Sequence, residues 1–154
     1  MSNLEKAAHR TLTIERTFNA PLALVWEAWT QAEHIAHWWG PPGMDVEIVE
    51  HNFTVDGKWK YRMTMPDGNP FISEGIYSEI IIQQKIVTSA DFRPMTEGVE
   101  LHMLFTPKGD KTHFVFHCVH ATEDYCRQQE KMGFFNGWGS AFDRLVQFMD
   151  SRAS

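Results

Sequence analysis

The sequence is poor in cysteine and lacks long hydrophobic runs. Only two cysteines occur among 154 residues, Cys118 and Cys126, so the dense disulfide framework of small secreted domains is excluded. No apolar stretch approaches the ~20 residues that cross a bilayer. Residues 1–10 also lack the apolar segment of a secretory signal. We therefore expect a cytoplasmic protein without a membrane anchor.

Positive charge is scarce as well. Lysine and arginine number 14 against 20 aspartates and glutamates, which gives a net charge of −6. Binding to a nucleic-acid backbone depends on basic patches that displace counterions, and an anionic membrane surface attracts the same kind of patch. With no run of five basic residues in the chain, we expect neither a nucleic-acid nor a membrane partner.

The common signatures of catalysis and metal binding are missing. The chain has no Walker lysine loop, no Gly-x-Ser-x-Gly elbow, no dinucleotide fingerprint, no His-Glu-x-x-His and no Cys-x-x-Cys. His113 and His117 share one face of a predicted strand, near His102. Residues four apart on a strand are ~13 Å apart, which is too far for one zinc ion. We expect no catalytic residue, no metal and no cofactor.

Aromatic residues, in contrast, are abundant. The chain has 11 Phe, 6 Trp and 3 Tyr, with 8 Met beside them. Large apolar side chains of this kind form a core, or they line a cavity for an apolar ligand. Composition alone leaves both interpretations open.

The length suits one domain, which we place at residues 10–150, with a flexible arm at 1–9 and a tail at 151–154. Residues 11–18 alternate in polarity and predict a half-buried strand. A helix follows, with Asn19 as a plausible cap and Pro21 in the first turn, because apolar residues recur at helical spacing from Leu22 to Trp29. A second short helix is predicted over 32–38, ending before Gly40-Pro41-Pro42-Gly43.

From Met44 to Val119 the pattern is a succession of strands. They are predicted at 46–53, 58–65, 71–82, 85–91, 99–106 and 112–119. Tight turns such as Val55-Asp56-Gly57 and Pro107-Lys108-Gly109-Asp110 separate them, which favours antiparallel hairpins over parallel crossovers. The side chains alternate along these strands, so one face of the sheet is covered. We predict that Trp59, Tyr61 and Met63 face inward, and that Phe114, Phe116 and Cys118 do the same.

The last segment, from about Thr122 to Met149, predicts a helix capped by Thr122. Its apolar stripe is formed by Phe135, Trp138, Phe142, Leu145, Val146 and Met149. Gly133, Gly137 and Gly139 weaken the helix by ~1 kcal/mol each relative to alanine. They mark either a break near Gly133 or a place where the backbone lies close to a neighbour. The expected fold is α+β, a curved antiparallel sheet of about seven strands wrapped on this helix.

Several segments together resemble a known family. They are Arg16-Thr17-Phe18-Asn19-Ala20-Pro21, Val25-Trp26-Glu27-Ala28-Trp29-Thr30, Trp38-Trp39-Gly40-Pro41, Gly75-Ile76-Tyr77-Ser78-Glu79-Ile80, and Asn136-Gly137-Trp138 with Leu145. In this order and spacing, over about residues 10–149, the chain resembles the domain named after the activator of the Hsp90 ATPase. That domain is a branch of the START-like, helix-grip superfamily.

This resemblance implies the helix-grip fold, with two short helices between the first two strands. It constrains function less, because the superfamily includes lipid and hormone binders, aromatase/cyclase enzymes and chaperone partners. The chain departs from the family pattern between the second and third strands. Members often carry an acidic residue and an Arg-x-Gly-Gly turn there, whereas this chain has His51-Asn52-Phe53-Thr54-Val55-Asp56-Gly57-Lys58.

Our leading hypothesis is a non-catalytic domain that binds a small apolar or aromatic molecule between the sheet and the last helix. The predicted lining residues are Trp39, Trp59, Tyr61, Met63, Phe114, Phe116, Phe135, Trp138 and Phe142. For the Trp38-Trp39 pair, two interpretations are weighed: a lid or wall of the cavity, or an anchor of the short helix on the sheet.

Two other hypotheses belong to different classes. A chaperone partnership is implied by the family name alone, and the eukaryotic namesakes carry a separate chaperone-binding domain for which 154 residues leave no room. A cyclase-like or hydrolytic enzyme would place Glu74, Glu79 or a histidine inside the cavity, where burial raises the pKa of a carboxyl group. The alternative for both glutamates is an exposed strand position. A homodimer is left open.

Overall fold

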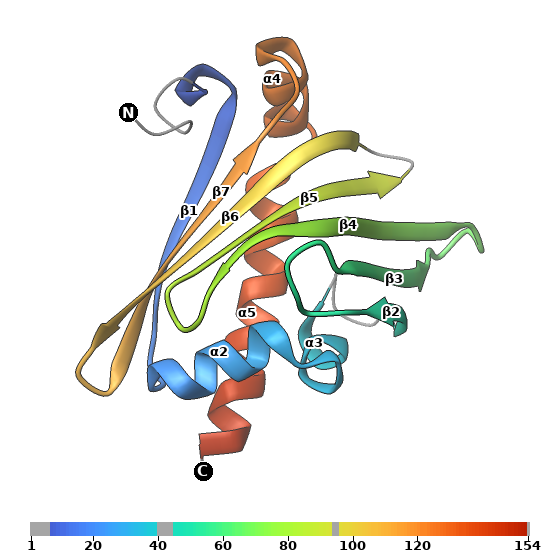
Figure 1. Ribbon diagram of the computed structural model, residues 1–154. Helices are drawn as coiled ribbons and strands as arrows, with labels where there is room; N and C mark the ends of the chain where they lie inside the picture. Colours follow the sequence, from blue (N-terminus) through green and yellow to red (C-terminus); the bar gives the residue numbers. More distant parts are fainter. Residues whose placement is uncertain (1–6, 40–44, 94–95, 154) are drawn as a thin grey trace.

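The computed structural model describes residues 7–39, 45–93 and 96–153. They form a curved antiparallel sheet of seven strands, in the order β1-β7-β6-β5-β4-β3-β2. The long C-terminal helix runs across the inner face of the sheet, and two short helices lie at one end (Figure 1). The predicted helix-grip fold is confirmed.

The elements agree closely with the predicted ranges. The strands are β1 (Thr11–Phe18), β2 (Val46–His51), β3 (Lys58–Thr64), β4 (Pro70–Ile81), β5 (Lys85–Arg93), β6 (Thr96–Lys108) and β7 (Lys111–Val119). The helices are the 3-10 turn η1 (Ala8–Arg10), α2 (Leu22–Thr30), α3 (Ala32–Trp38), α4 (Glu123–Lys131) and α5 (Phe134–Ala153).

Two details near the N-terminus differ from the predictions. Ala7 is buried and η1 contacts α4, whereas Ala8 and His9 are exposed, so the predicted flexible arm at 1–9 includes a packed residue at Ala7; residues 1–6 lie outside the described range. Helix α2 is capped by Pro21, whose carbonyl accepts the first helical hydrogen bonds from the amides of Leu24 and Val25. Asn19 therefore lies too early in the chain to be the cap.

The predicted strand faces are confirmed. Trp59, Tyr61 and Met63 are at most 5% exposed, while Lys58 and Arg62, which alternate with them along the strand, lie on the outside. The rings of Phe114 and Phe116 on β7 are also fully buried. Because neighbouring strands pair in register, the inward residues of all seven strands form one continuous apolar surface. Helix α5 and the two short helices cover this surface.

The predicted last helix is broken into α4 and α5 at Gly133. This residue has a φ of 103°, a left-handed conformation that glycine adopts without steric cost. The predicted cap is confirmed, since the Thr122 hydroxyl accepts a hydrogen bond of 3.0 Å from the Tyr125 amide. No described atom lies within 4 Å of the position a Cβ would take on Gly137. Close approach of the backbone to a neighbour therefore does not explain why position 137 is a glycine.

Candidate functional site

A small cavity lies on the inner side of the sheet, between the two short helices and strands β3 to β6. Its volume is about 20 Å³, which holds about one water molecule. Most of the wall is aromatic or aliphatic. The described lining residues are Trp29, Ile35, Trp38, Trp39, Trp59, Tyr61, Tyr77, Ile86, Thr88, Leu101 and Met103.

Three of the predicted lining residues, Trp39, Trp59 and Tyr61, line this cavity. Apart from Phe135, the others fill the rest of the space between the sheet and α5 as ordinary core. Their rings pack directly, with centroids 4.6 Å apart for Phe116 and Trp138 and 5.6 Å apart for Phe114 and Phe142. The seam is thus largely filled, and the cavity is confined to the side nearest α3.

Phe135 is the one predicted lining residue that lies on the surface. Its side chain is 45% exposed, whereas the neighbouring Phe134 is 8% exposed and contacts the ring of His120. Both phenylalanines lie in the first turn of α5, after the break at Gly133. Because an α-helix turns about 100° per residue, two adjacent residues cannot both point toward the sheet, and in this helix Phe134 takes the inward position.

Sequence reasoning missed Trp29, Tyr77 and Thr88. Trp29 was assigned to the inward stripe of its helix but not to a cavity. Tyr77 lies on the inward face of β4, two positions beyond Gly75 and four beyond Ser73, which pair with Trp59 and Tyr61. The alternation of β3, carried across the hairpin to β4, was therefore a signal that could have identified Tyr77.

Trp38 and Trp39 take different roles. Trp38 is fully buried and donates a 2.9 Å hydrogen bond to the Ala28 carbonyl, which anchors α3 on α2. Trp39 forms part of the cavity wall and contacts the rings of Trp59 and Tyr61. Trp39 therefore fits the wall interpretation, whereas the hydrogen bond of Trp38 anchors the short helix on α2 rather than on the sheet. Gly40-Pro41-Pro42-Gly43 lies outside the described residues.

The indole of Trp59 is held by a specific polar contact. Its Nε1 donates to the Thr88 hydroxyl at 2.8 Å, and that hydroxyl lies 3.1 Å from the Ile76 carbonyl and 2.8 Å from the Ser89 carbonyl. A threonine hydroxyl can accept from the indole and donate to one of these carbonyls. Both polar groups are buried and satisfied, so this part of the wall has a fixed geometry.

His51 extends the polar contacts from the cavity wall to the surface. Its Nδ1 lies 2.9 Å from the Tyr61 hydroxyl, and its Nε2 lies 2.6 Å from the Thr30 carbonyl at the end of α2. Burial lowers the pKa of His51, although the backbone contact to Thr30 acts in the opposite direction. The imidazole is therefore neutral at pH 7.

Tyr61 and Tyr77 bring hydroxyl groups to the cavity wall. Burial raises the pKa of Tyr61, and the neighbouring Tyr77 raises it further. Burial likewise raises the pKa of Tyr77, against a smaller lowering effect of the neighbouring Tyr61 hydroxyl. Both phenols therefore keep their protons at neutral pH, and neither serves as a base there.

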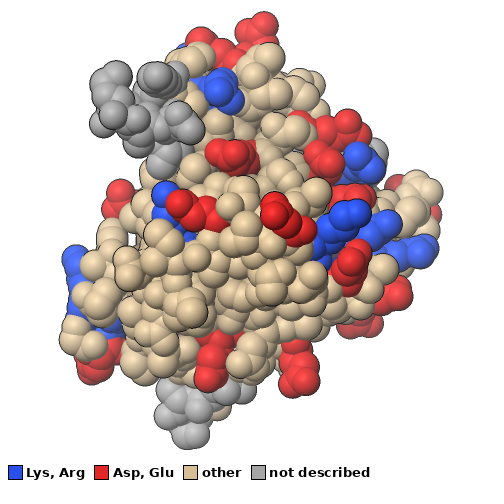
Figure 2. All heavy atoms as spheres, in the orientation of Figure 1, with Lys and Arg blue, Asp and Glu red and all other residues tan. Residues whose placement is uncertain are grey.

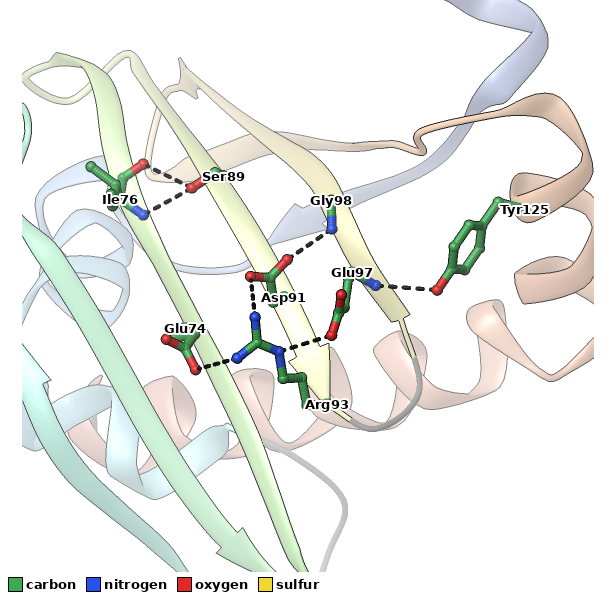
Figure 3. A network of polar contacts seen from close by, with 8 residues as sticks. All are labelled: Glu74, Ile76, Ser89, Asp91, Arg93, Glu97, Gly98 and Tyr125. Atoms are coloured by element: carbon green, nitrogen blue, oxygen red, sulfur yellow. Dashed lines mark hydrogen bonds and ion pairs between the residues drawn. The ribbon is translucent and has the colours of Figure 1, made fainter.

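The two carboxylates that an enzyme hypothesis required lie on the outer face of the sheet. Glu74 pairs with Arg93 at 3.5 Å, within a network in which Arg93 also contacts Asp91 and Glu97 (Figure 3). Glu79 pairs with Lys85 at 2.7 Å. Exposed ion pairs of this kind contribute little to stability. None of the described lining residues is a carboxylate or an imidazole.

The cysteines offer no reactive thiol. Cys118 and Cys126 are both free and buried. Burial raises the pKa of the Cys118 thiol, and the nearby Cys126 raises it further; burial also raises the pKa of Cys126. The reactive species is the thiolate, so these side chains act as small core residues. The predicted inert character of Cys118 agrees with this environment.

The outer surface is mixed in charge. On the face shown in Figure 2, Lys and Arg gather in separate groups, and Asp and Glu lie between them beside a wide uncharged area. Within residues 7–39, 45–93 and 96–153, no three His, Cys, Asp or Glu side chains are arranged to hold a metal ion. Over the same residues, no helix combines the length and apolar character needed to cross a bilayer.

The family model described as "Activator of Hsp90 ATPase homolog 1-like protein" matches residues 19–150. No curated protein matches the chain significantly.

Solved bacterial structures share its fold. A protein from Nitrosomonas europaea is 22% identical with a TM-score of 0.82, and covers 95% of this chain and 97% of its own. A protein from Mycobacterium smegmatis is also 22% identical, with a TM-score of 0.84 and coverage of 95% and 94%. An AHSA1-like protein from Aeromonas hydrophila is 18% identical, with a TM-score of 0.73 and coverage of 93% and 94%.

Proposed function

The chain belongs to the Activator of Hsp90 ATPase homolog 1-like family, and we propose that it is a non-catalytic domain that binds a small aromatic molecule at the cavity beside Trp39. The observation that supports the proposal is the chemical composition of the cavity wall. It is mostly apolar, and its hydroxyl-bearing residues Tyr61, Tyr77 and Thr88 all come from the sheet, which is the usual composition of a small-molecule site.

Binding requires the cavity to open, because about 20 Å³ is far below the ~300 Å³ of a typical ligand pocket. Trp39 is the side chain best placed to move. It is the most exposed of the described lining residues, at 7%, and its indole has a long 3.4 Å hydrogen bond to Ser73. Its backbone is fixed independently, since Arg144 donates to the carbonyls of His37 and Trp39 at 3.0 Å each.

The direct test is titration of the protein with phenol, indole and naphthalene, followed by thermal unfolding and by NMR chemical shifts. We expect a concentration-dependent rise in Tm, with shift changes concentrated on residues such as Trp59, Tyr61 and Leu101. Phe135→Ala is the matched control, because it removes an exposed ring outside the cavity and should leave binding unchanged. Absence of any shift at millimolar probe would contradict the proposal.

The family description also names an ATPase activator, and the same protein sample tests that alternative. If the rate of an Hsp90-type ATPase does not change when the chain is added in excess, chaperone activation is removed as a function of this domain. An increased rate together with no aromatic binding would replace our proposal with that alternative.

A further inference from the structure

An open groove lies at the end of the sheet where the β6–β7 hairpin extends past the β4–β5 turn (Figure 1). Strand β5 begins at Lys85, opposite Leu104 of β6, whereas β6 continues to Lys108 and pairs there with β7. Leu22, at the start of α2, borders the same space. The groove has a volume of about 700 Å³, within the range of about 300–1,000 Å³ that is typical of small-molecule sites.

The walls of the groove are fixed by backbone hydrogen bonds. The Phe105 amide donates to the Gln84 carbonyl at 2.8 Å and joins β6 to the β4–β5 turn. The Gln84 amide donates to the Ile81 carbonyl at 2.9 Å within that turn. The groove therefore needs no rearrangement to admit a molecule, in contrast to the cavity beside Trp39, and binding there does not carry the cost of opening.

The edge of β6 in the groove is poorly suited to pairing with an added strand. Backbone groups two residues apart along a strand face the same side. Because the Phe105 amide faces the β4–β5 turn, the next residue whose N–H would face the groove is Pro107, and proline has no N–H. Proline at such a place blocks extension of the sheet by another chain. The groove therefore suits a small molecule better than a peptide strand or a second copy.

The accessible lining is mostly aliphatic. Ile81 is 41% exposed and Ile82 is 73% exposed, whereas the one aromatic lining residue, Phe105, is 4% exposed. Apolar side chains that are exposed together mark interaction sites, and an aliphatic chain laid along them removes their surface from water. The apolar lining residues are Leu22, Ile81, Ile82, Leu104, Phe105 and Pro107.

The one charge among the described lining residues is positive. Lys85 Nζ lies 2.7 Å from the Glu79 carboxylate, and both side chains are partly exposed, a situation in which an ion pair contributes little to stability. An ammonium group has three N–H donors, so Lys85 can bind the carboxylate of a ligand beside Glu79 or in its place. Gln83 and Gln84, which also line the groove, carry amide donors for the same group.

We propose that this groove binds carboxylic acids with an aliphatic chain, with the chain on Ile81 and Ile82 and the carboxylate on Lys85. The groove shares no described lining residue with the cavity beside Trp39. This second site therefore goes beyond the proposed function and does not depend on it.

The test is titration of the full chain with octanoate and with 1-octanol, which has the same chain length but no charge. Calorimetry measures the dissociation constants, and amide chemical shifts locate the bound probe. Ile82→Asn removes an exposed apolar side chain, and Lys85→Gln removes the charge. The matched controls are Val55→Asn, at an exposed apolar turn residue, and Lys58→Gln, at an exposed lysine on β3.

We expect octanoate to bind to the wild-type chain with shift changes at Ile82, Gln84 and Thr106. Ile82→Asn and Lys85→Gln should each weaken octanoate binding by about fivefold, the effect of losing one exposed contact. In Lys85→Gln the affinity for 1-octanol should change by less than about twofold, because the alcohol has no charge to pair. Both control variants should bind octanoate as the wild type does.

Three results would overturn the proposal: no octanoate binding at millimolar concentration, shift changes confined to the wall of the cavity beside Trp39, or an unchanged octanoate affinity in Lys85→Gln. Equal losses of octanoate and 1-octanol affinity in Lys85→Gln would overturn the assignment of the carboxylate to that side chain. Phenol binding tests the proposed function separately, so failure at one site is distinguishable from failure at the other. The two exposed substitutions act independently, which keeps the test decisive if one variant does not fold.

Discussion

Truncation of Trp39 is the most informative single change, because the same ring closes the cavity and packs the core. The indole is 7% exposed, and its ring lies within 6 Å of those of Trp38, Trp59, Tyr61 and Trp138. Replacement of a ring buried in this way by alanine costs about 3–5 kcal/mol. Trp39→Phe keeps most of the packing and loses a long hydrogen bond, so we expect it to cost only about 1 kcal/mol.

Urea unfolding followed by circular dichroism measures both variants. With an m value of about 2 kcal/mol per M, Trp39→Ala should lower the unfolding midpoint by roughly 1.5–2.5 M. The domain should remain folded, because domains of this kind have about 5–15 kcal/mol of stability. A loss below about 1 kcal/mol in Trp39→Ala would refute the description of the ring as packed core.

Trp39→Ala also separates the free-energy cost of opening the cavity from the affinity of the opened cavity for a ligand. If moving the Trp39 ring costs the wild-type protein about 3 kcal/mol, only a small fraction of the molecules is competent to bind, and the apparent affinity falls by the same factor. Trp39→Ala avoids this cost and should bind phenol about 100-fold more tightly than wild type. Equal affinities would show that this ring does not gate the site.

Three further predictions concern stability. Gly75→Ala should destabilise the domain by more than about 3 kcal/mol, because the new Cβ would lie 1.9 Å from the Ser89 carbonyl oxygen. A decrease in the free energy of unfolding of less than about 1 kcal/mol would be inconsistent with this packing. Gly137→Ala should instead stabilise it by about 1 kcal/mol, since the site is open and helical; a lower Tm would contradict this.

Burial lowers the pKa of His51, His117 and His120 below the ordinary value of 6.5. The unfolded chain therefore binds more protons just below pH 6.5, so their contribution to stability is complete above that pH and is lost as the pH falls. Urea midpoints should decrease between pH 7 and pH 5.5, and a rise over that range would exclude this linkage.

The sequence carried enough information for the fold because its signals are local and repeated. The alternation from Lys58 to Met63 assigns both faces of β3, and the tight turns force neighbouring strands to pair in antiparallel order. Thr122 and Gly133 mark the ends of α4 through capping and backbone geometry that depend on a few adjacent residues. Signals of this kind do not require knowledge of distant contacts.

The candidate site was only partly predictable, because cavity volume depends on how distant side chains fit together. Phe116 and Trp138 were correctly assigned to the seam, but their direct contact fills the space that a pocket would need. His51 could not be connected to Tyr61 from the sequence, since the contact also depends on the end of α2 being close to β2. The departure from the family pattern, which begins at His51, was the available signal.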